Sequence, residues 1–378
     1  MSCRRIVYVS GTRADFGLLA STLLRADADP GLDVSICVTG MHLLPEFGLT
    51  VREVEATGLP IMARIPVDFA GADGTGMARA LGQALIGMTE AFVAQRPDLV
   101  LLLGDRGEML AGALAALHLN IPIAHLHGGE RSGTVDEPVR HAISKLSHYH
   151  FTATTGARER LVRMGEHPDH VFVTGAPGLD GLTEQLGQDR LALCDKYQLD
   201  PARPVALVVF HPVVQEACSA GTQMKNLMAA VRAKNLQALC LMPNADAGNA
   251  SIRAALEAWR GDPDVRLVTH LPRAEFISWM AAADVQVGNS SSGIIEAASF
   301  GLPVVNVGSR QSEREQSGNV VDCDTTQIAI LEAIEAARAL CGRKFVNVYG
   351  NGNAGKRIVE LLATLPLDLS VLGKKNAY

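Results

Sequence analysis

Aromatic residues are scarce in this sequence: they make up 4% of its 378 residues, while 48% of the residues are hydrophobic. The core must therefore be built from aliphatic side chains, which suits parallel sheets covered by helices better than a β-sandwich. Basic residues are not in excess, because the net charge is −6, so we expect no nucleic-acid partner. No apolar stretch approaches the roughly 20 residues that cross a membrane, and the first residues lead directly into a strand without a signal peptide. These absences predict a cytoplasmic protein with no membrane partner.

The seven cysteines are scattered along the chain and form no C-x-x-C pair. Several lie inside apolar runs, as Cys240 does in LQALCLM. This spacing indicates reduced, buried thiols and neither a zinc site nor a disulfide framework. The G-x-G-x-x-G fingerprint of dinucleotide-binding proteins is also missing, which argues against NAD-dependent redox chemistry. We therefore expect no cofactor.

Short apolar runs alternate with helical segments along the chain, which is the pattern of βα units on a parallel sheet. The composition changes between Leu179 and Pro204, and the alternation then restarts. We expect an α/β protein with the GT-B fold, in which two Rossmann-like domains face each other across a cleft. The expected domains are residues 1–178, completed by a C-terminal helix within 354–378, and residues 179–353, which bind the nucleotide. Strands are expected at residues 6–10, 34–38, 99–103, 121–126, 150–154, 171–174, 205–210, 238–242, 265–269, 285–287 and 303–307, and helices at 18–25, 109–118, 156–164 and 354–364.

The segment Pro97 to Ser147 is dense in proton-handling groups, although only 20% of the chain is charged. Two expected strands end there, and a helix begins there. Because the carboxyl ends of parallel strands form the ligand-binding edge of a sheet, these groups are expected to lie on one wall of the cleft. The spacing of Asp105, His127 and His141 fits no metal-ligand motif, so we expect no metal. The catalytic candidates are Asp105, Arg106, His127, Glu130, Asp136 and His141.

The second half contains the signature of an anion site in Ser290-Ser291-Ser292-Gly293, which opens a helix. Serine hydroxyls and free N–H groups there suit phosphate oxygens, and Glu296, one turn later, suits the two hydroxyls of a ribose. Taken by itself, this motif would be explained by ordinary capping of a helix. Arg310 on a neighbouring loop, together with Arg13 in the Gly11–Gly17 loop of the other domain, favours a nucleotide diphosphate. The candidate nucleotide- and substrate-binding residues are Arg13, Asp15, His211, Asn244, His270, Ser290, Ser291, Ser292, Gly293, Glu296 and Arg310.

Seven motifs occur in collinear order between Ile6 and about Val321: GTRADFG, GDR, HGGE with SGTVDEPVRHAISKLSH, FHP, PNADAG, GNSSSGIIE and GSRQSEREQSGNV. Together they resemble the hydrolysing UDP-N-acetylglucosamine 2-epimerases. The resemblance implies elimination of UDP to leave 2-acetamidoglucal. Addition of water then gives free N-acetylmannosamine for sialic-acid-type sugars, without metal or NAD. It also implies a homodimer or homotetramer.

The resemblance assigns roles to individual residues. It makes Asp105 and Asp136 the catalytic carboxylates, with Arg106 as a neighbouring active-site arginine. It makes Glu296 the ribose-binding residue. The diphosphate contacts that it implies are Arg13, His211, Asn244, Ser290, Ser291 and Arg310.

One position departs from the family pattern. Where the resemblance leads us to expect a catalytic glutamate, this chain has His127. Either Glu130 takes over the acid/base role, or the substrate is a different 2-acetamido sugar. The second alternative would fit the legionaminic-acid pathway, whose enzymes act on UDP- or GDP-linked 2,4-diacetamido-2,4,6-trideoxyglucose. Both alternatives stay open at the level of sequence.

Other functions use the same fold. A GT-B glycosyltransferase would need an acceptor pocket, and a non-hydrolysing epimerase would return a UDP-linked sugar. A sugar-nucleotide sensor would bind UDP without turnover. The acid-rich stretch from Asp105 to Asp136 favours chemistry on the sugar itself. The Gly-rich segment Pro66–Gly76 is either a loop that closes over the site or a plain surface loop.

Overall fold

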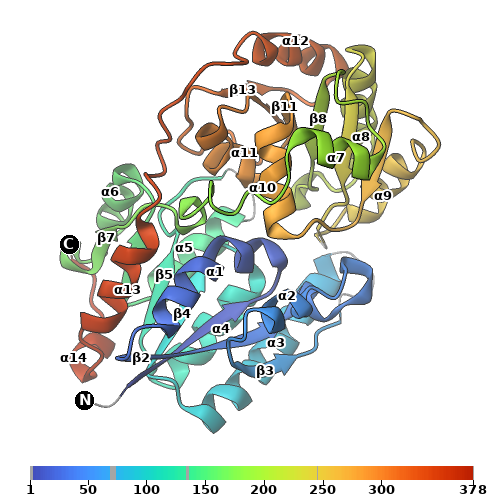
Figure 1. Cartoon of the computed structure of the whole chain (residues 1–378). Helices are drawn as coiled ribbons and strands as arrows, with labels where there is room; N and C mark the ends of the chain where they lie inside the picture. Colours follow the sequence, from blue (N-terminus) through green and yellow to red (C-terminus); the bar gives the residue numbers. More distant parts are fainter. Residues whose placement is uncertain (1–2, 69–73, 133–135, 245, 378) are drawn as a thin grey trace.

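Two parallel β-sheets follow one another along the chain in the computed structural model, which describes residues 3–68, 74–132, 136–244 and 246–377 (Figure 1). The strand orders are β3-β2-β1-β4-β5-β6-β7 and β10-β9-β8-β11-β12-β13, and the strands pair in parallel. This arrangement confirms the expected pair of Rossmann-like sheets. The strands are β1 (Arg4–Ser10), β2 (Leu32–Thr39), β3 (Ile61–Ile65), β4 (Leu99–Leu103), β5 (Ile123–Leu126), β6 (Tyr149–Thr152), β7 (Val171–Val173), β8 (Val205–Val209), β9 (Gln237–Leu241), β10 (Val265–Val268), β11 (Val285–Gly288), β12 (Val304–Val307) and β13 (Val320–Cys323).

Helices cover both sheets, as the alternating pattern predicts. None of the helices within the described ranges has both the length and the apolar character that a membrane span requires. The helices are α1 (Arg13–Asp27), α2 (Val51–Ala56), α3 (Gly74–Gln95), α4 (Gly107–His118), α5 (Asp136–Leu146), α6 (Thr155–Arg163), α7 (Arg190–Tyr197), α8 (Ala220–Ala233), α9 (Asn249–Glu257), α10 (Arg273–Ala282), α11 (Ser291–Ile295), α12 (Gln327–Arg338), α13 (Ala354–Thr364) and α14 (Leu369–Leu372).

The first helix begins earlier than the sequence analysis predicts. The segment Gly11–Gly17 was expected to be a loop before a helix at Leu18, and this expectation is wrong because α1 starts at Arg13. A reciprocal capping box explains the early start: the Thr12 hydroxyl accepts from the Asp15 N–H, and the Asp15 carboxylate accepts from the Thr12 N–H at 2.7 Å. The cap places Arg13 in the first turn of the helix.

The strands that the sequence analysis did not predict, β3 and β13, are the outer strands of their sheets. Their residues are mostly half-buried or exposed, so neither strand shows a continuous apolar run. Parts of three stretches singled out by the sequence analysis lie outside the described residues. They are 69–73 of the Gly-rich segment, 133–135 of the SGTVDEP motif, and Ala245 of the PNADAG motif.

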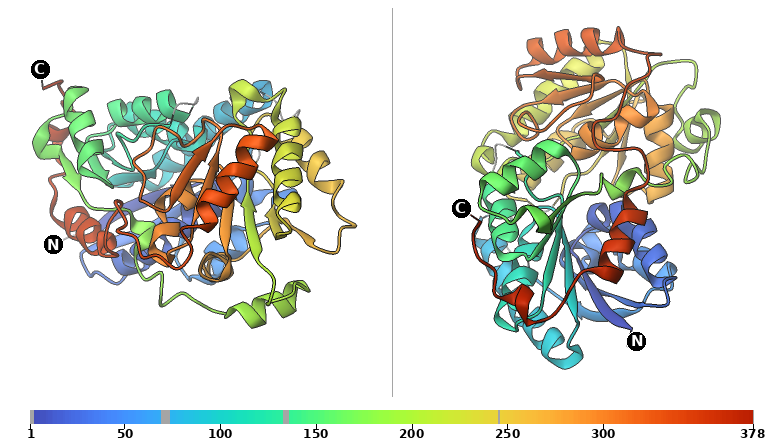
Figure 2. Two further views of the ribbon diagram at one scale, coloured as in Figure 1. Left: turned by 90° about the horizontal axis from the view of Figure 1, so that it is seen from above. Right: turned by 90° about the vertical axis from the view of Figure 1, so that its left-hand side faces the viewer.

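The helix α13 packs against α1 of the first sheet, although it follows the whole second sheet in sequence (Figures 1 and 2). Its residues Ile358 and Leu362 belong to the apolar core that β1, β2 and β4 share with α1. The Asp180 carboxylate accepts from the N–H groups of Ala354 at 2.9 Å and Gly355 at 2.6 Å, which satisfies the start of α13. The chain therefore passes between the two sheets twice.

Candidate active site

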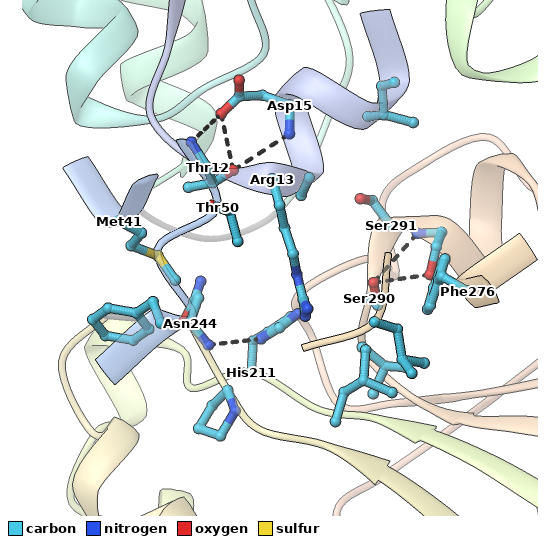
Figure 3. Close-up of a pocket in the computed structure, with 18 of the residues that line it drawn as sticks. Thr12, Arg13, Asp15, Met41, Thr50, His211, Asn244, Phe276, Ser290 and Ser291 are labelled. Carbon is cyan, nitrogen blue, oxygen red and sulfur yellow. Dashed lines mark hydrogen bonds between the residues drawn. The ribbon is translucent and has the colours of Figure 1, made fainter. Parts of the chain in front are cut away.

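A cavity of about 240 Å³ lies between the carboxyl ends of the strands of both sheets. Its lining residues follow β1, β2 and β4 on one side and β8, β9, β10, β11 and β12 on the other. Open α/β sheets bind ligands at this edge. In Figure 3, Arg13 reaches across from α1 toward His211, with Asn244 on one side and Ser290 and Ser291 on the other. The predicted residues that line the cavity are Arg13, Asp15, Asp105, Arg106, His211, Asn244, Ser290, Ser291, Ser292, Glu296 and Arg310.

The serine loop is the start of α11. The Ser290 hydroxyl caps this helix, and Ser292 donates its own hydroxyl to Ser290 at 3.0 Å. Gly293 does not line the cavity. A Cβ at this position would lie 2.9 Å from Val304 Cγ1, so the glycine allows close packing against β12. Glu296 is 1% exposed, and one of its carboxylate oxygens accepts from Arg273, a lining residue that the sequence analysis missed.

The imidazole of His211 is held neutral at the centre of the second wall. Burial and the nearby guanidinium groups of Arg310, Arg13 and Arg106 lower the pKa of His211 well below its usual value. Its Nδ1 accepts from the Asn244 N–H at 3.3 Å. The loop is fixed by the side-chain amide of Asn289, which accepts from the His211 N–H at 2.7 Å and donates to the His211 carbonyl at 2.8 Å.

A contact through His270 joins the two walls. Arg13 Nη1 lies 2.6 Å from His270 Nδ1, and His270 Nε2 contacts the Glu53 carboxylate on α2. Because a guanidinium only donates, Nδ1 must accept, and Nε2 therefore carries the proton toward Glu53. Asp15 lines the cavity, and its buried carboxylate accepts from Ser10, Tyr8, Thr12 and the Gly11 N–H. It stabilises the start of α1.

Three carboxylates and three arginines alternate beside the cavity, and two of these six residues, Asp105 and Arg310, line it. The carboxylates Asp105, Glu130 and Asp136 come from the first half, as does Arg140, whereas Arg310 and Arg314 come from the second half. Asp105 contacts Arg140 and lies 3.9 Å from Arg314, while Asp136 lies 3.4 Å from Arg310. Glu130 contacts Arg314. The interleaved charges connect the two halves of the molecule.

The two aspartates are pushed in opposite directions by their surroundings. Burial would raise the pKa of Asp105, but Arg140, Arg314 and Arg310 outweigh it and lower that pKa. Burial and the neighbouring Asp105 raise the pKa of Asp136 above its usual value. Two carboxylates split in this way can serve as an ionised group and a proton carrier in the same site.

The remaining catalytic candidates lie around this wall. Arg106 Nε is 3.3 Å from Glu108, and its Nη1 is 3.5 Å from Asp246 of the second half. His127 and Glu130 are buried and pair at 2.5 Å, and neither is among the residues that line the cavity. His141 is not brought to the cavity: it is half-exposed, and its Nε2 lies 3.5 Å from Glu137, one turn earlier on α5.

Sequence reasoning named Arg310 but missed the other two cationic partners of these carboxylates, Arg140 and Arg314. Arg140 follows Asp136 by four residues, one helical turn, and Arg314 follows Arg310 by four residues in the GSRQSERE motif. Those spacings were readable signals. In the parts of the chain that the structure describes, no group of three or more His, Cys, Asp or Glu side chains is arranged to hold a metal ion.

Two facing Rossmann-like sheets with a cavity between their strand ends define the GT-B class of nucleotide-sugar-binding folds. The family model described as UDP-N-acetylglucosamine 2-epimerase matches residues 24–363, and the chain belongs to this family. It is 52% identical to the UDP-N,N'-diacetylbacillosamine 2-epimerase (hydrolyzing) of Legionella pneumophila, over 99% of this chain and 100% of that protein. It is 33% identical to the UDP-N-acetylglucosamine 2-epimerase of Neisseria meningitidis, over 89% and 88% of the two chains.

Solved structures agree on the fold. The crystal structure of the UDP-GlcNAc 2-epimerase from Neisseria meningitidis bound to UDP-GlcNAc superposes with a TM-score of 0.81 at 21% identity, covering 95% of this chain and 99% of that chain. The GT-B expectation from sequence is thereby confirmed.

Proposed function

We propose that the protein is a hydrolysing nucleotide-sugar 2-epimerase that converts a UDP-linked 2-acetamido sugar into UDP and the free manno-configured sugar. The observation that carries the proposal is the cavity itself. One side of it presents groups suited to a nucleotide diphosphate, and the other presents Asp105, whose pKa is lowered. Asp136, whose pKa is raised, lies next to the cavity, 3.4 Å from the lining residue Arg310. Membership of the 2-epimerase family supports the same reaction.

The sugar is one of two candidates. N-acetylglucosamine is named in the 33% identical Neisseria relative. The 52% identical Legionella relative is named for N,N'-diacetylbacillosamine, a 2,4-diacetamido sugar, and this observation brings in the second candidate. The role of His127 can be tested with either sugar.

The nucleotide diphosphate is proposed to bind between Arg13, Arg310 and the serine loop, with Glu296 on the ribose. Arg310 is 3.4 Å from Asp136. A diphosphate that binds Arg310 takes over a positive charge that otherwise favours the ionised form of Asp136. Substrate binding would therefore prepare Asp136 to carry a proton.

The proposed reaction has two steps. A base removes the C2 proton, a C1–C2 double bond forms, and the C1–O bond breaks with its electron pair leaving on the diphosphate. Water then adds its oxygen to C1, and a proton returns to C2 from the opposite face. We assign the proton transfers to Asp136 and His127, and we assign to the ionised Asp105 the stabilisation of positive charge at C1. Arg106, held by Glu108 and Asp246, would contribute positive charge beside the leaving group.

Several wider expectations accompany this proposal. We propose that residues 1–178 with 354–378 and residues 179–353 are the two functional domains. We also propose a cytoplasmic homodimer or homotetramer in sialic-acid-like or legionaminic-acid sugar biosynthesis that needs neither metal nor organic cofactor. Seven free cysteines support a reducing compartment.

The test is incubation of the protein with UDP-N-acetylglucosamine and, separately, with UDP-N,N'-diacetylbacillosamine in deuterated water, followed by NMR. The proposal predicts UDP and a free manno-configured sugar with deuterium at C2 from at least one substrate. A UDP-linked product would show a non-hydrolysing epimerase instead. Bound substrate without turnover would favour a sensor or a glycosyltransferase that awaits an acceptor.

A further inference from the structure

We propose that Arg314 and Glu130 are positioning residues that hold His127 in one tautomer, with Nδ1 protonated and Nε2 available as the proton-accepting atom. This inference rests on the proposed function and assigns to Glu130 a role other than direct proton transfer. The chain of contacts runs from Arg314 to Glu130 and from Glu130 to His127.

Glu130 is in the wrong state to act as an acid. Its carboxylate is 4% exposed, one oxygen contacts Arg314 Nη1, and the other lies 2.5 Å from His127 Nδ1. Burial would raise the pKa of Glu130, but Arg314, His127 and Arg140 outweigh burial and lower this pKa far below its usual value. Both oxygens therefore serve as permanent hydrogen-bond acceptors.

An ionised carboxylate fixes the proton position on the imidazole. It can only accept a hydrogen bond, so Nδ1 must carry a proton and donate it to Glu130. The neutral imidazole then has its lone pair on Nε2, for which the described part of the chain offers no hydrogen-bond partner. A histidine oriented by a carboxylate in this way is a better proton acceptor than a free one.

The backbone is built to make this contact. His127 has a φ of +60°, in the left-handed region, and directly follows β5. Gly128 and Gly129 then turn the chain so that Glu130 folds back onto His127, three residues earlier. The carbonyl of Glu130 accepts from Arg140 Nη1 at 3.0 Å, which fixes the end of the turn. A residue in this strained conformation is often maintained for function.

Arg314 also connects this pair to the rest of the site. Its Nη1 contacts Glu130 and its Nη2 lies 3.9 Å from Asp105, so one guanidinium bridges the two carboxylates. Since Arg314 comes from the second half, the bridge forms only when the two halves are closed on each other. Closure of the cleft would therefore complete the orientation of His127.

A matched control lies beside this pair. Arg131 and Glu313 form an ion pair between the same two loops, but both side chains are largely exposed, at 49% and 43%, and neither contacts His127. The variant Glu313→Gln removes an ion pair between the halves without changing the proposed relay. The variants Glu130→Asp and Arg314→Lys keep the charges and test rescue.

The experiment is a double-mutant cycle on kcat and KM with the substrate that the protein turns over. His127→Ala and Glu130→Gln should each lower kcat about 10²-fold or more, with KM changed far less. The double variant should lose no more than His127→Ala alone, because Glu130 acts through His127. Glu130→Asp and Arg314→Lys should retain part of the rate, and Glu313→Gln should retain the full rate.

A second measurement does not depend on turnover. With ¹⁵N-labelled histidine, the signal that disappears in His127→Ala should report a protonated Nδ1 in the unmutated protein and lose that signature in Glu130→Gln. Losses that add in the double variant, near-normal turnover of His127→Ala, or a protonated Nε2 would each overturn the inference. If no sugar is turned over, the proposed function fails while the ¹⁵N signal still decides the tautomer.

Discussion

Replacing Gly129 by alanine tests whether the HGGE turn is as tightly packed as the structure indicates. Gly129 has a φ of +78°, and a Cβ added there would lie 2.4 Å from the backbone oxygen of Ala157 and 2.8 Å from Leu161 Cγ. Gly58 has the same φ of +78° but nothing within 4 Å of an added Cβ. The two substitutions therefore share the conformational cost and differ in steric cost.

The magnitudes follow from this comparison. A left-handed alanine costs about 1–2 kcal/mol relative to its preferred conformation, and this cost applies to both variants. In Gly129→Ala, the Ala157 carbonyl must also move about 1 Å to reach an ordinary contact of 3.4 Å, and it belongs to the backbone of α6. Overpacking of this kind costs about 1–3 kcal/mol more. Gly129→Ala should thus be destabilised by about 1–3 kcal/mol relative to Gly58→Ala.

The assay is urea denaturation followed by far-UV circular dichroism. Tryptophan fluorescence is unsuitable, because Trp259 and Trp279 both lie in the second half of the chain, far in sequence from the turn. The kcat of Gly129→Ala should fall as well, since the substitution displaces Glu130, whereas that of Gly58→Ala should be unchanged. Equal unfolding free energies for the two variants, within about 0.5 kcal/mol, would refute the steric reasoning.

Three further predictions concern charge. Asp105→Asn should lower kcat about 10²–10⁴-fold while UDP affinity, measured by calorimetry, changes less than about tenfold, and an unaltered kcat would exclude a catalytic role. Arg273→Met should lower the unfolding free energy, measured by urea denaturation, by about 3 kcal/mol. This is the low end for a broken buried ion pair, because Arg273 is 20% exposed. The added change Glu296→Gln should recover part of that loss. Burial lowers the pKa of His125 to about 3 and the pKa of His148 to about 4, so the unfolded chain binds protons below about pH 6.5 that the folded chain does not. The unfolding free energy should therefore fall as the pH is lowered from 6.5 to 4, and an unchanged urea midpoint over that range would contradict this assignment.

The parts of the fold that depend on local pattern were predictable from the sequence. The strand Leu99–Leu103 and the helix Ala354–Thr364 have the predicted bounds, because a continuous apolar run and a strong amphipathic repeat are local signals. The edge strands β3 and β13 lack such a run. The start of α1 was misread although Thr12 and Asp15 form a capping-box sequence, because the glycines on either side suggested a loop.

The site was predictable to the extent that strand ends meet at one edge of a sheet. That rule placed Asp105 near Arg106 and His211 near Asn244. It could not pair Glu130 with Arg314, which are 184 residues apart, or show that Glu296 already has a cationic partner in Arg273. Those contacts depend on how the two sheets pack against each other, which no local pattern encodes.

The return of α13 to the first sheet has a consequence for biosynthesis. A ribosome makes β1 to β7 first, but the apolar surface that α1 offers to Ile358 and Leu362 stays uncovered until residues beyond the second sheet have been translated. The second sheet can bury its own core earlier, since its strands and the helices that pack on them are contiguous in sequence. The nascent protein would therefore complete its later half before its earlier one. The exposed face of α1 is where we expect chaperones to bind during translation.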